Sequence, residues 1–552
     1  MKRLFTSALM ALLAASSVFA DWNPSDNSYT VLTDYNEYGQ AQMKTLRATD
    51  GTIVHTWLET ADSLSYNDPR FGYYLHMQIF SPQGQPLFDN NGVLVSQQPT
   101  LTYTTDYDVK FAQNGDVLLA YWDVRRDTVN RTYGDAYVYR YNLKGEPVWP
   151  ASGVKIPQRV FKNGGRLIAP QLAVAGSNIY FAADYVEYYK EKATEDNWEP
   201  SPWFPDEEMP DSIDLSYDEY QLQLLNEDGQ LQWNEPLTLQ SDRIQIYPCS
   251  SDLYLLFAND SLGLSARRID ATGADVWKDS VIIEEEALTS SGFFPEIEVE
   301  PDGEGGLSLF YRKLYGWTGY MVMNRLRPDG TVLPEAVSLN ASVDGDGDNV
   351  KTAVNRGKAF TAWSYDAGTS SKQLCVNLLS TDGASLWTGD RQNGYALGEN
   401  SLWGFTAVKV IPRVDGWVLL YGESTSWNGA NFYATKINDE GDLVWKKQLL
   451  EDGMTSSGFS VVSDDTRAYI FYTCDREIGD DWEEVPGEGG MRVLCVDITD
   501  AGNVATDIDL PATDGDTTPR FYSLQGQQLP AAPASGVYIV RQGGTAHKVV
   551  VK

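Results

Sequence analysis

Carboxylates are the side chains of this 552-residue sequence that are plentiful enough to support chemistry. An acid ends the second apolar stretch of most repeat units described below. The acids are Glu59, Asp123, Asp184, Asp260, Asp366, Glu423 and Asp475. Gathered on one face, they form a ring that can bind a cation or a basic ligand, and two of them about 5 to 9.5 Å apart can serve as the acid and base of a glycoside hydrolase. Acidic residues also favour turns, so strand ends alone produce the same pattern.

The segment 343–349, VDGDGDN, offers a second set of carboxylates. Asp344, Asp346 and Asp348 have the spacing of the first ligands in a calcium-binding loop. Asn349 stands where such a loop needs glycine, and Asn355 stands where it ends on glutamate. The segment therefore predicts either a loose Ca²⁺ site or an acidic linker, and the sequence indicates no other cofactor.

Two insertions carry aromatic side chains among acids, at 185–217 and 476–490. Exposed aromatic rings beside acids suit stacking on a sugar or contact with a protein. A lid that packs its own aromatics is the alternative interpretation. The predicted ligand-binding residues are Tyr188, Tyr189, Trp198, Trp203, Phe204 and Trp482, together with the strand-end acids Asp123, Asp184, Asp366, Glu423 and Asp475.

Histidine is scarce, which narrows the enzyme classes. The sequence holds His55, His76 and His547, so a catalytic triad or a histidine-rich metal site would need one of the first two. Both lie in strand-like segments, where an ordinary structural role is the simpler interpretation. The sequence contains no phosphate-binding loop, no dinucleotide fingerprint and no HExxH motif. No catalytic residue is assigned, and enzymatic activity stays open.

The elements that must position these residues are repeated hairpins. An alternating strand precedes a tight turn with glycine, and the fourth residue after that glycine is aromatic in six of eight copies. Examples are YNLKGEPVW, ending at Trp149, and INDEGDLVW, ending at Trp445. Asp439, Glu440 and Asp442 in the latter vary between copies, which indicates solvent-facing turn residues. The turn glycines are Gly84, Gly145, Gly229, Gly273, Gly330, Gly383, Gly441 and Gly502.

A second hairpin precedes each of these, for example 109–123 and 170–184, and its second strand is almost entirely apolar. One unit is thus four antiparallel strands, as in a propeller blade. Units from about 42 to 510 predict an all-β fold, a β-propeller of about eight four-stranded blades. Seven blades or an array of β-sandwiches are the alternatives. Residues 21–39 could supply a closing strand.

The composition indicates where the protein is located and argues against one class of partner, nucleic acid. Residues 1–20 have a basic start, an apolar run and a small-x-small end, typical of a secretory signal peptide. No later run is long and apolar enough for a membrane helix, so we expect a soluble mature protein without a transmembrane segment. A formal net charge of −35 repels phosphate backbones and argues against nucleic acid as a partner.

Buried free thiols are expected for Cys249, Cys375, Cys474 and Cys495, with one disulfide as the alternative.

The alternation of these hairpins over about 42–510 resembles secreted β-propeller proteins of the Bacteroidetes. After a linker at 511–519, residues 520–552 resemble the C-terminal sorting signal of type IX secretion cargo. The matching pieces are 524–526 (LQG), 536–540 (GVYIV) and 548–552 (KVVVK). The tail itself predicts three short β-strands. The resemblance implies recognition by the secretion machinery through this tail, and a secreted or outer-membrane-surface location.

These patterns favour a propeller at 21–510 that binds an extracellular glycan or protein through one face. A secreted glycoside hydrolase that uses two strand-end carboxylates is the second hypothesis. A structural or adhesion component of the cell surface is the third.

Overall fold

The computed structural model of the chain describes most of the propeller and parts of the tail. It covers residues 22, 29–32, 40–60, 72–89, 92–101, 107–125, 133–194, 209–240, 244–259, 263–285, 288, 297–315, 318–339, 346–366, 371–425, 430–450, 459–474, 490–500, 520–522, 528–529, 536–542 and 545–551. The predicted signal peptide and linker lie outside these residues.

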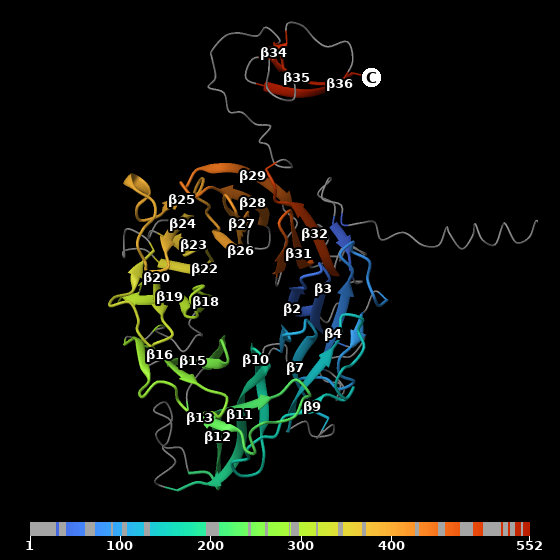
Figure 1. Cartoon of the computed structure of the whole chain (residues 1–552), viewed down its shortest axis with the longest axis vertical. Coiled ribbons are helices and arrows are strands. Elements are labelled where there is room, and N and C mark those ends of the chain that lie inside the picture. Colours follow the sequence, from blue (N-terminus) through green and yellow to red (C-terminus); the bar gives the residue numbers. More distant parts are fainter. Residues whose placement is uncertain are drawn as a thin grey trace, which may run out of the picture. The chain divides into compact units, whose positions relative to one another are not determined.

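Eight four-stranded antiparallel sheets form a ring, so the protein contains an eight-bladed β-propeller (Figure 1). Blades 1 to 4 comprise β2–β5 (Gln40–Arg47, Ile53–Thr60, Tyr73–Phe80, Val93–Leu94), β6–β9 (Asp108–Phe111, Val117–Asp123, Asp135–Tyr141, Val154–Lys155), β10–β13 (Arg166–Ala175, Asn178–Lys192, Ser212–Leu225, Leu237–Leu239) and β14–β17 (Ile244–Cys249, Asp252–Asn259, Gly263–Ile269, Val281–Glu284). The predicted fold class is confirmed, with eight blades rather than seven.

The other four blades continue the same order. Blades 5 to 8 comprise β18–β21 (Ile297–Pro301, Leu307–Tyr315, Thr318–Leu326, Val337–Ser338), β22–β25 (Asp346–Asn355, Lys358–Asp366, Lys372–Ser380, Tyr395–Ala396), β26–β29 (Phe405–Arg413, Gly416–Ser424, Ala430–Ile437, Leu443–Leu450) and β30–β32 (Phe459–Ser463, Arg467–Cys474, Gly490–Asp497) with β1 (Tyr29–Val31). A short 3-10 helix, η1 (Gly389–Arg391), precedes β25.

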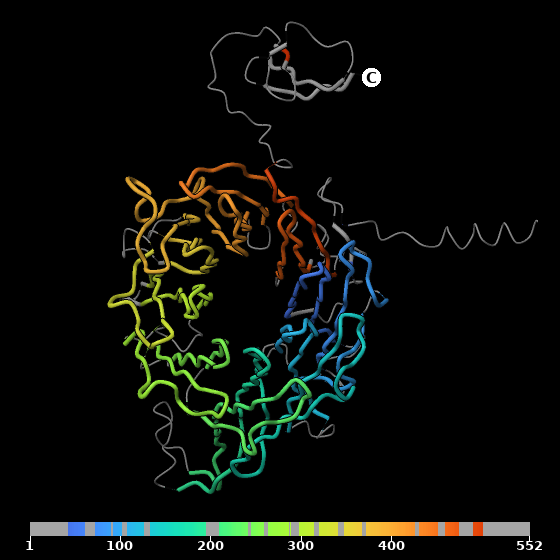
Figure 2. The backbone as a smooth tube through the Cα atoms, viewed as in Figure 1, coloured from blue at the N-terminus to red at the C-terminus, as the bar shows by residue number. Residues whose placement is uncertain are grey.

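The ring closes through the N-terminal segment, as the closing-strand hypothesis expected. β1 pairs antiparallel with β32, and Tyr29 lies opposite Leu494. The last blade therefore combines strands from both ends of the propeller sequence. Figure 2 shows blade 1, in blue, next to blade 8, in red-orange.

The second strand of each blade forms the packed middle of its sheet. The seven residues of β7, VLLAYWD, are all buried, because neighbouring blades cover both faces of the strand. Apolar clusters fill the space between neighbouring blades, as between blades 2 and 3, where Trp122 packs with Phe181. The first strands, such as β2, β10 and β26, face the ring centre, and the fourth strands lie at the rim (Figure 1).

Strand order defines two faces. In blades 1 to 7 the first-to-second and third-to-fourth turns lie on one face, which we call the lower face; blade 8 has its first-to-second turn there. The second-to-third connections and the links between blades lie on the other, which we call the upper face.

On the lower face, the recurring tryptophan joins one blade to the next. Trp387 of blade 6 donates from Nε1 to the carbonyl of Asp439 in blade 7, at 2.9 Å. Gly441 has φ +87°, and a Cβ added there would lie 2.9 Å from Cε2 of Trp387. The glycine is thus required twice, by the turn and by the indole beneath it. The same indole-to-carbonyl bond joins Trp149 to Glu227, Trp233 to Ala271 and Trp277 to Pro328.

The aromatic residue of the hairpin lies outside the fourth strand in most blades. In blades 1 to 4 and blade 6 the aromatic lies between the glycine turn and the fourth strand, and not inside that strand; Trp149, for example, precedes β9. In blade 7 the fourth strand, β29, begins directly after the turn and includes Trp445.

A cation five residues before the turn glycine reaches the next blade from blades 2, 4, 5 and 7. Arg325 pairs with Asp302 of its own blade at 2.8 Å and with Asp382 of the next blade at 2.6 Å. Lys436 likewise pairs with Asp415 and with Asp500. Arg140 and Arg268 use an acid of their own blade and a carbonyl of the next. We call each of these lower-face contacts, made by a tryptophan or by a cation with the next blade, a junction clasp.

The tail forms a separate unit. By its contacts the chain divides into two compact units, Met1–Asn503 and Val504–Lys552. The second contains a four-stranded sheet in the order β34 (Gln528–Leu529), β33 (Arg520–Tyr522), β35 (Gly536–Gln542) and β36 (Thr545–Val551). The three expected strands are present, and β34 is an addition. Among the described residues, no helix has the length and apolar character needed to span a membrane.

Candidate functional site

The structure places the described strand-end acids on the upper face, but in unlike environments. Glu59, Asp123, Asp184, Asp366 and Glu423 lie in the second strands of blades 1, 2, 3, 6 and 7, toward the upper end. Asp260 and Asp475 lie outside the described residues.

Asp123 is the most enclosed of these acids. Its side chain is 0% exposed and pairs with Arg125 at 2.7 Å. It also accepts a hydrogen bond from Ser96 at 2.8 Å, and the Arg125 guanidinium lies 3.6 Å from the centre of the Tyr137 ring. The paired cation two residues along the chain thus holds Asp123 inside blade 2, away from any ligand.

The other acids remain partly accessible. Glu59 accepts a hydrogen bond from Nε1 of Trp57 at 2.7 Å. Asp366 and Glu423 are half-buried at the upper ends of β23 and β27. These unlike surroundings differ from the uniform ring that a shared cation would need.

Asp184 differs from the others because a second carboxylate lies beside it. Burial, and then the charge of Asp218, raise the pKa of Asp184 to about 7. Val186 lies opposite Asp218 in the β11–β12 ladder, so Asp184 and Asp218 are diagonal neighbours on one face. Near neutral pH this pair holds one carboxyl group that is partly protonated beside a second acid.

The insertion at 185–217 is largely a continuation of blade 3. The pairing of β11 with β12 runs from Ile179 opposite Leu225 to Lys192 opposite Ser212. Residues 185–192 and 212–217 therefore form a two-stranded arm that extends the second and third strands on the upper side. Trp198, Trp203 and Phe204, between its two strands, lie outside the described residues, as does Trp482 of the second insertion.

Strand alternation separates the two tyrosines predicted for ligand contact. Tyr188 is 67% exposed. Tyr189 points to the opposite side, where the Phe161 ring lies 5.8 Å away and Nζ of Lys162 lies 4.0 Å from its ring centre. Phe161 in turn stacks on Tyr217 at 3.8 Å. Tyr189 thus belongs to an internal aromatic stack of the arm, and Tyr188 alone of the two faces solvent.

Glu187, which the sequence did not single out, anchors this stack. It is fully buried and accepts hydrogen bonds from the Tyr185 hydroxyl at 2.5 Å and from the Lys162 amide at 3.1 Å. Burial alone would raise the pKa of Glu187, but the N–H groups of Asn163 and Lys162 and the Tyr185 hydroxyl outweigh it and hold the pKa below its usual range. The carboxylate therefore ties the loop before β10 to the arm. Its signal in the sequence is the alternation Tyr185, Glu187, Tyr189, typical of one strand face.

The predicted calcium loop begins a strand instead. Asp346 and Asp348 lie in β22, and Asp348 is exposed. Asp344 lies outside the described residues. Extended backbone spreads successive acids along a strand, whereas a calcium loop curls them around one point. Across the described part of the chain, no three His, Cys, Asp or Glu side chains converge as metal ligands.

The histidines of blade 1 lie in a stack of rings at the closing seam. His55 is buried, its ring lies 4.4 Å from Phe471 of blade 8, and its Nδ1 contacts the Thr45 hydroxyl at 2.9 Å. Burial lowers the pKa of His55 to about 3. His76 stacks on Trp57 at 5.2 Å. His55 therefore packs as a neutral ring. Cys249, Cys375 and Cys495 are buried free thiols, as expected.

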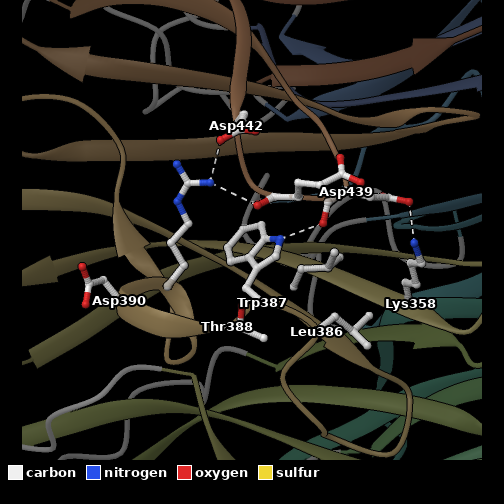
Figure 3. Close-up of a pocket in the computed structure, with 10 residues that line it drawn as sticks. Lys358, Leu386, Trp387, Thr388, Asp390, Asp439 and Asp442 are labelled. Atoms are coloured by element: carbon white, nitrogen blue, oxygen red, sulfur yellow. Dashed lines mark hydrogen bonds and ion pairs between the residues drawn. The ribbon is translucent and has the colours of Figure 1, made fainter.

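A cavity of about 710 Å³ lies at the lower junction of blades 6 and 7 (Figure 3). The acids that the sequence treated as turn residues border it. Asp439 pairs with Lys358, and Asp442 pairs with Arg391 at 2.8 Å. These charges hold adjacent blades together, so the turn residues are structural, although they are not mere surface decoration.

No family model and no curated protein matches the sequence. Solved structures with a similar chain path include a protein of unknown function from Dyadobacter fermentans, with 10% identity, a TM-score of 0.36, and coverage of 85% of this chain and 98% of that one. The β-propeller domain of the Trilobed protease from Pyrococcus furiosus has 10% identity and a TM-score of 0.36, with coverage of 75% of this chain and 99% of that one. The polysaccharide lyase Uly1 has 8% identity and a TM-score of 0.42, with coverage of 86% of this chain and 95% of that one. Similarities this low assign no activity to the chain.

Proposed function

We propose that the protein is a binding propeller that holds an extracellular glycan or protein at the arm of blade 3. The observation that carries the proposal is the exposure of Tyr188 on a strand pair that extends beyond the repeating blade. Glu187 and the Phe161–Tyr217 stack stiffen this arm from its other side. A stiff arm presents its exposed ring at little cost in conformational entropy, which favours ligand binding.

The test compares the protein with Tyr188→Ala on arrays of glycans and of purified extracellular proteins. Val276→Ala, which removes an exposed apolar side chain from the lower face, is the matched control. We expect Tyr188→Ala to weaken binding about tenfold or more, a loss of about 1.4 kcal/mol, and the control to bind normally. Equal binding by all three proteins would place the site elsewhere.

A second variant tests the part of the arm between its paired strands. Lys192 and Ser212 are register partners, so an Asn-Gly turn can replace residues 193–211 without disturbing the ladder. Loss of binding in this variant, with Tyr188 present, would assign ligand contact to the replaced segment that holds Trp198, Trp203 and Phe204.

The carboxyl pair Asp184 and Asp218 favours a second candidate, a glycoside hydrolase. A carboxyl group with a pKa near 7 can donate a proton while a neighbouring carboxylate acts as nucleophile or base. Activity on a panel of aryl glycosides should then fall above about pH 7 and vanish in Asp184→Asn. Absence of turnover on the whole panel would remove this candidate and leave the binding proposal intact.

We also propose export through the signal peptide at 1–20 and the sorting tail at 520–552, which carry the resemblance described above. In a host with type IX secretion, deletion of 520–552 should leave the protein inside the cell envelope. Secretion of the truncated chain at the normal level would contradict this route.

A further inference from the structure

A second exposed aromatic lies on the upper face at the link between blades 6 and 7. Residues 397–404 connect β25 to β26, and within them Leu402 is 73% exposed and Trp403 is 51% exposed. The other described tryptophans whose burial is classified are less exposed, and most pack inside or between blades. An apolar pair this exposed is a feature of binding surfaces.

The backbone beneath Trp403 is fixed. Ser401 exchanges two backbone hydrogen bonds with Lys372, at 2.8 and 3.0 Å. Its hydroxyl accepts the N–H groups of Trp403 and Gly404, each at 3.3 Å, and donates to the Ser424 carbonyl at 3.2 Å. The Ser424 amide closes the loop on the Gly404 carbonyl at 3.0 Å. The exposed ring therefore stands on a turn held by two strands, β24 through Lys372 and β27 through Ser424.

The equivalent link between blades 1 and 2 shows that exposure is not a requirement of the fold. There Thr100 makes the same two-bond bridge to Tyr73, at 2.9 and 2.8 Å. The residue that follows it, Leu101, is only partly exposed and packs against an interblade cluster. The bridge is thus a structural part of the link, and Leu402 is exposed where its counterpart Leu101 is packed.

Two amide side chains lie at the same turn as Trp403, together with the side chain of Lys372, whose Cδ would lie 2.9 Å from a Cβ on Gly404. Nε2 of Gln373 donates to Oδ1 of Asn400 at 3.1 Å, and Nδ2 of Asn400 donates to the Ser371 hydroxyl at 3.4 Å. Each amide has two N–H donors and an oxygen with two lone pairs, so both keep capacity for further hydrogen bonds. The exposed carboxylate of Glu399 adds an acceptor.

A flat ring next to amide donors and acceptors matches the two sides of a sugar. The C–H face of a pyranose packs on an aromatic ring, and its hydroxyl groups bond to amides and carboxylates. The formal net charge of −35 disfavours an anionic ligand, and a neutral sugar can also accept a hydrogen bond from Lys372, whose side chain lies beside Gly404. A purely apolar partner would leave the remaining donors and acceptors of the Asn400 and Gln373 amides without partners.

We propose that Trp403, Asn400 and Gln373 form a carbohydrate-binding subsite for a neutral sugar. This inference rests on the proposed binding function and names its ligand class as a glycan. It adds a contact point on a blade other than the one that bears the arm. Trp403 supplies the stacking surface, and the amides select the orientation of the hydroxyl groups.

Titration with cello-, xylo-, malto- and laminari-oligosaccharides, followed by calorimetry, tests the subsite in the full protein. Trp403→Ala should weaken binding of the best oligosaccharide about tenfold or more, and Trp403→Phe, which keeps an aromatic face, should weaken it by about threefold. Asn400→Ala, which keeps the ring, should give an intermediate loss. Because Trp403 is exposed, these variants should unfold at the same temperature as the parent protein, which checks that the fold is intact.

Tyr188→Ala separates this inference from the proposed function. Sugar binding that is lost in Trp403→Ala and retained in Tyr188→Ala supports the subsite and moves the binding function away from the arm. Loss in Tyr188→Ala alone overturns the subsite and leaves the arm proposal standing. No affinity of the parent protein for any of the four oligosaccharide series at millimolar concentration also overturns the subsite.

Discussion

The junction clasps of the lower face and the arm of blade 3 on the upper face use similar residues for different ends. Both combine aromatic rings with charged side chains. In a clasp, the indole or the cation has a partner in the next blade, as Trp387 has in Asp439 and Arg325 has in Asp382. In the arm, the ring of Tyr188 is left in solvent, although its neighbours are paired. The difference shows that repetition accompanies structural roles here, and that departures from the repeat are the places to seek ligands.

The largest loss of stability is expected when a clasp is broken. Arg325 is 3% exposed and holds Asp302, Glu304 and Asp382. Arg325→Ala leaves the buried Asp302 charge without its partner and should lower the free energy of unfolding by about 3 to 5 kcal/mol. Chemical denaturation measures the loss.

The control for that experiment is Arg327→Ala in the same strand connection. Arg327 is 35% exposed and shares Asp382 as a partner. A surface pair contributes about 1 kcal/mol or less, so this variant should remain close to the parent. Equal losses in the two variants would contradict the structural role assigned to the clasp.

A smaller effect is expected from the turn glycine. Gly441→Ala forces a side chain into a positive-φ backbone and against the indole of Trp387. Gly115→Ala meets the same backbone strain at φ +89°, but no atom lies within 4 Å of the added carbon. Strain alone should cost about 1 to 2 kcal/mol in both variants. An extra loss in Gly441→Ala, measured by denaturation, reports the indole contact.

The stability of the propeller at His55 and the local stability of the arm at Asp184 should change with pH in opposite directions. His55 has a folded-state pKa of about 3, below its unfolded value of 6.5. The unfolded chain therefore binds the extra proton between these values, and the stability contribution is lost as pH falls below about 6.5, by up to about 1.4 kcal/mol per pH unit. Denaturation of the parent and of His55→Gln, followed as a function of pH, tests this slope. A slope that persists in the variant would assign the acid sensitivity to other groups.

Asp184 should act in the opposite direction. Its pKa is raised to about 7, so the folded state binds the extra proton between about pH 4 and 7. The arm is therefore expected to lose local stability as pH rises through this window. Hydrogen exchange of β11 and β12 in the parent and in Asp184→Asn measures it. Protection that is independent of pH in the parent would contradict the environment described for this carboxyl group.

The smallest difference in stability is expected between the alanine variants of two adjacent tyrosines of the arm. Tyr189→Ala removes contacts with Phe161 and Lys162 and should cost about 1 kcal/mol. Tyr188→Ala removes an exposed ring and should change stability by less than about 0.5 kcal/mol. Thermal unfolding of both variants provides the comparison. A larger loss in Tyr188→Ala would mean that its ring is packed and not available to a ligand.

The blade could be predicted from the sequence because its signals are local and repeated. Alternating residues, a turn glycine and a tryptophan four residues later define a hairpin wherever they occur. The partner of Trp387 could not be predicted in this way, because the pattern marks a packed ring but does not say which blade supplies the other half. The same limit hid the role of Asp439 and Asp442 at the junction.

The candidate site was predicted less completely, for reasons that particular residues explain. Asp123 looked like its sister acids, although Arg125 two residues later signals its ion pair. Tyr188 and Tyr189 were grouped because 185–217 was interpreted as a loop, where alternation carries no meaning. Trp403 follows no repeat and lies in a short link, so no pattern marked it before the fold placed it on the upper face.

Closure of the ring by β1 has a consequence for how the chain folds. Tyr29 is made early and Leu494 is made late, yet the two residues are neighbours in the last blade. Contacts between such distant positions form slowly, because a long chain segment must be ordered first. Blades 1 to 7 can stack in order of synthesis, whereas the seam must wait for almost the entire propeller sequence. Until then blades 1 and 8 expose their apolar sides, and a chain shortened before β32 would keep them exposed and prone to aggregation.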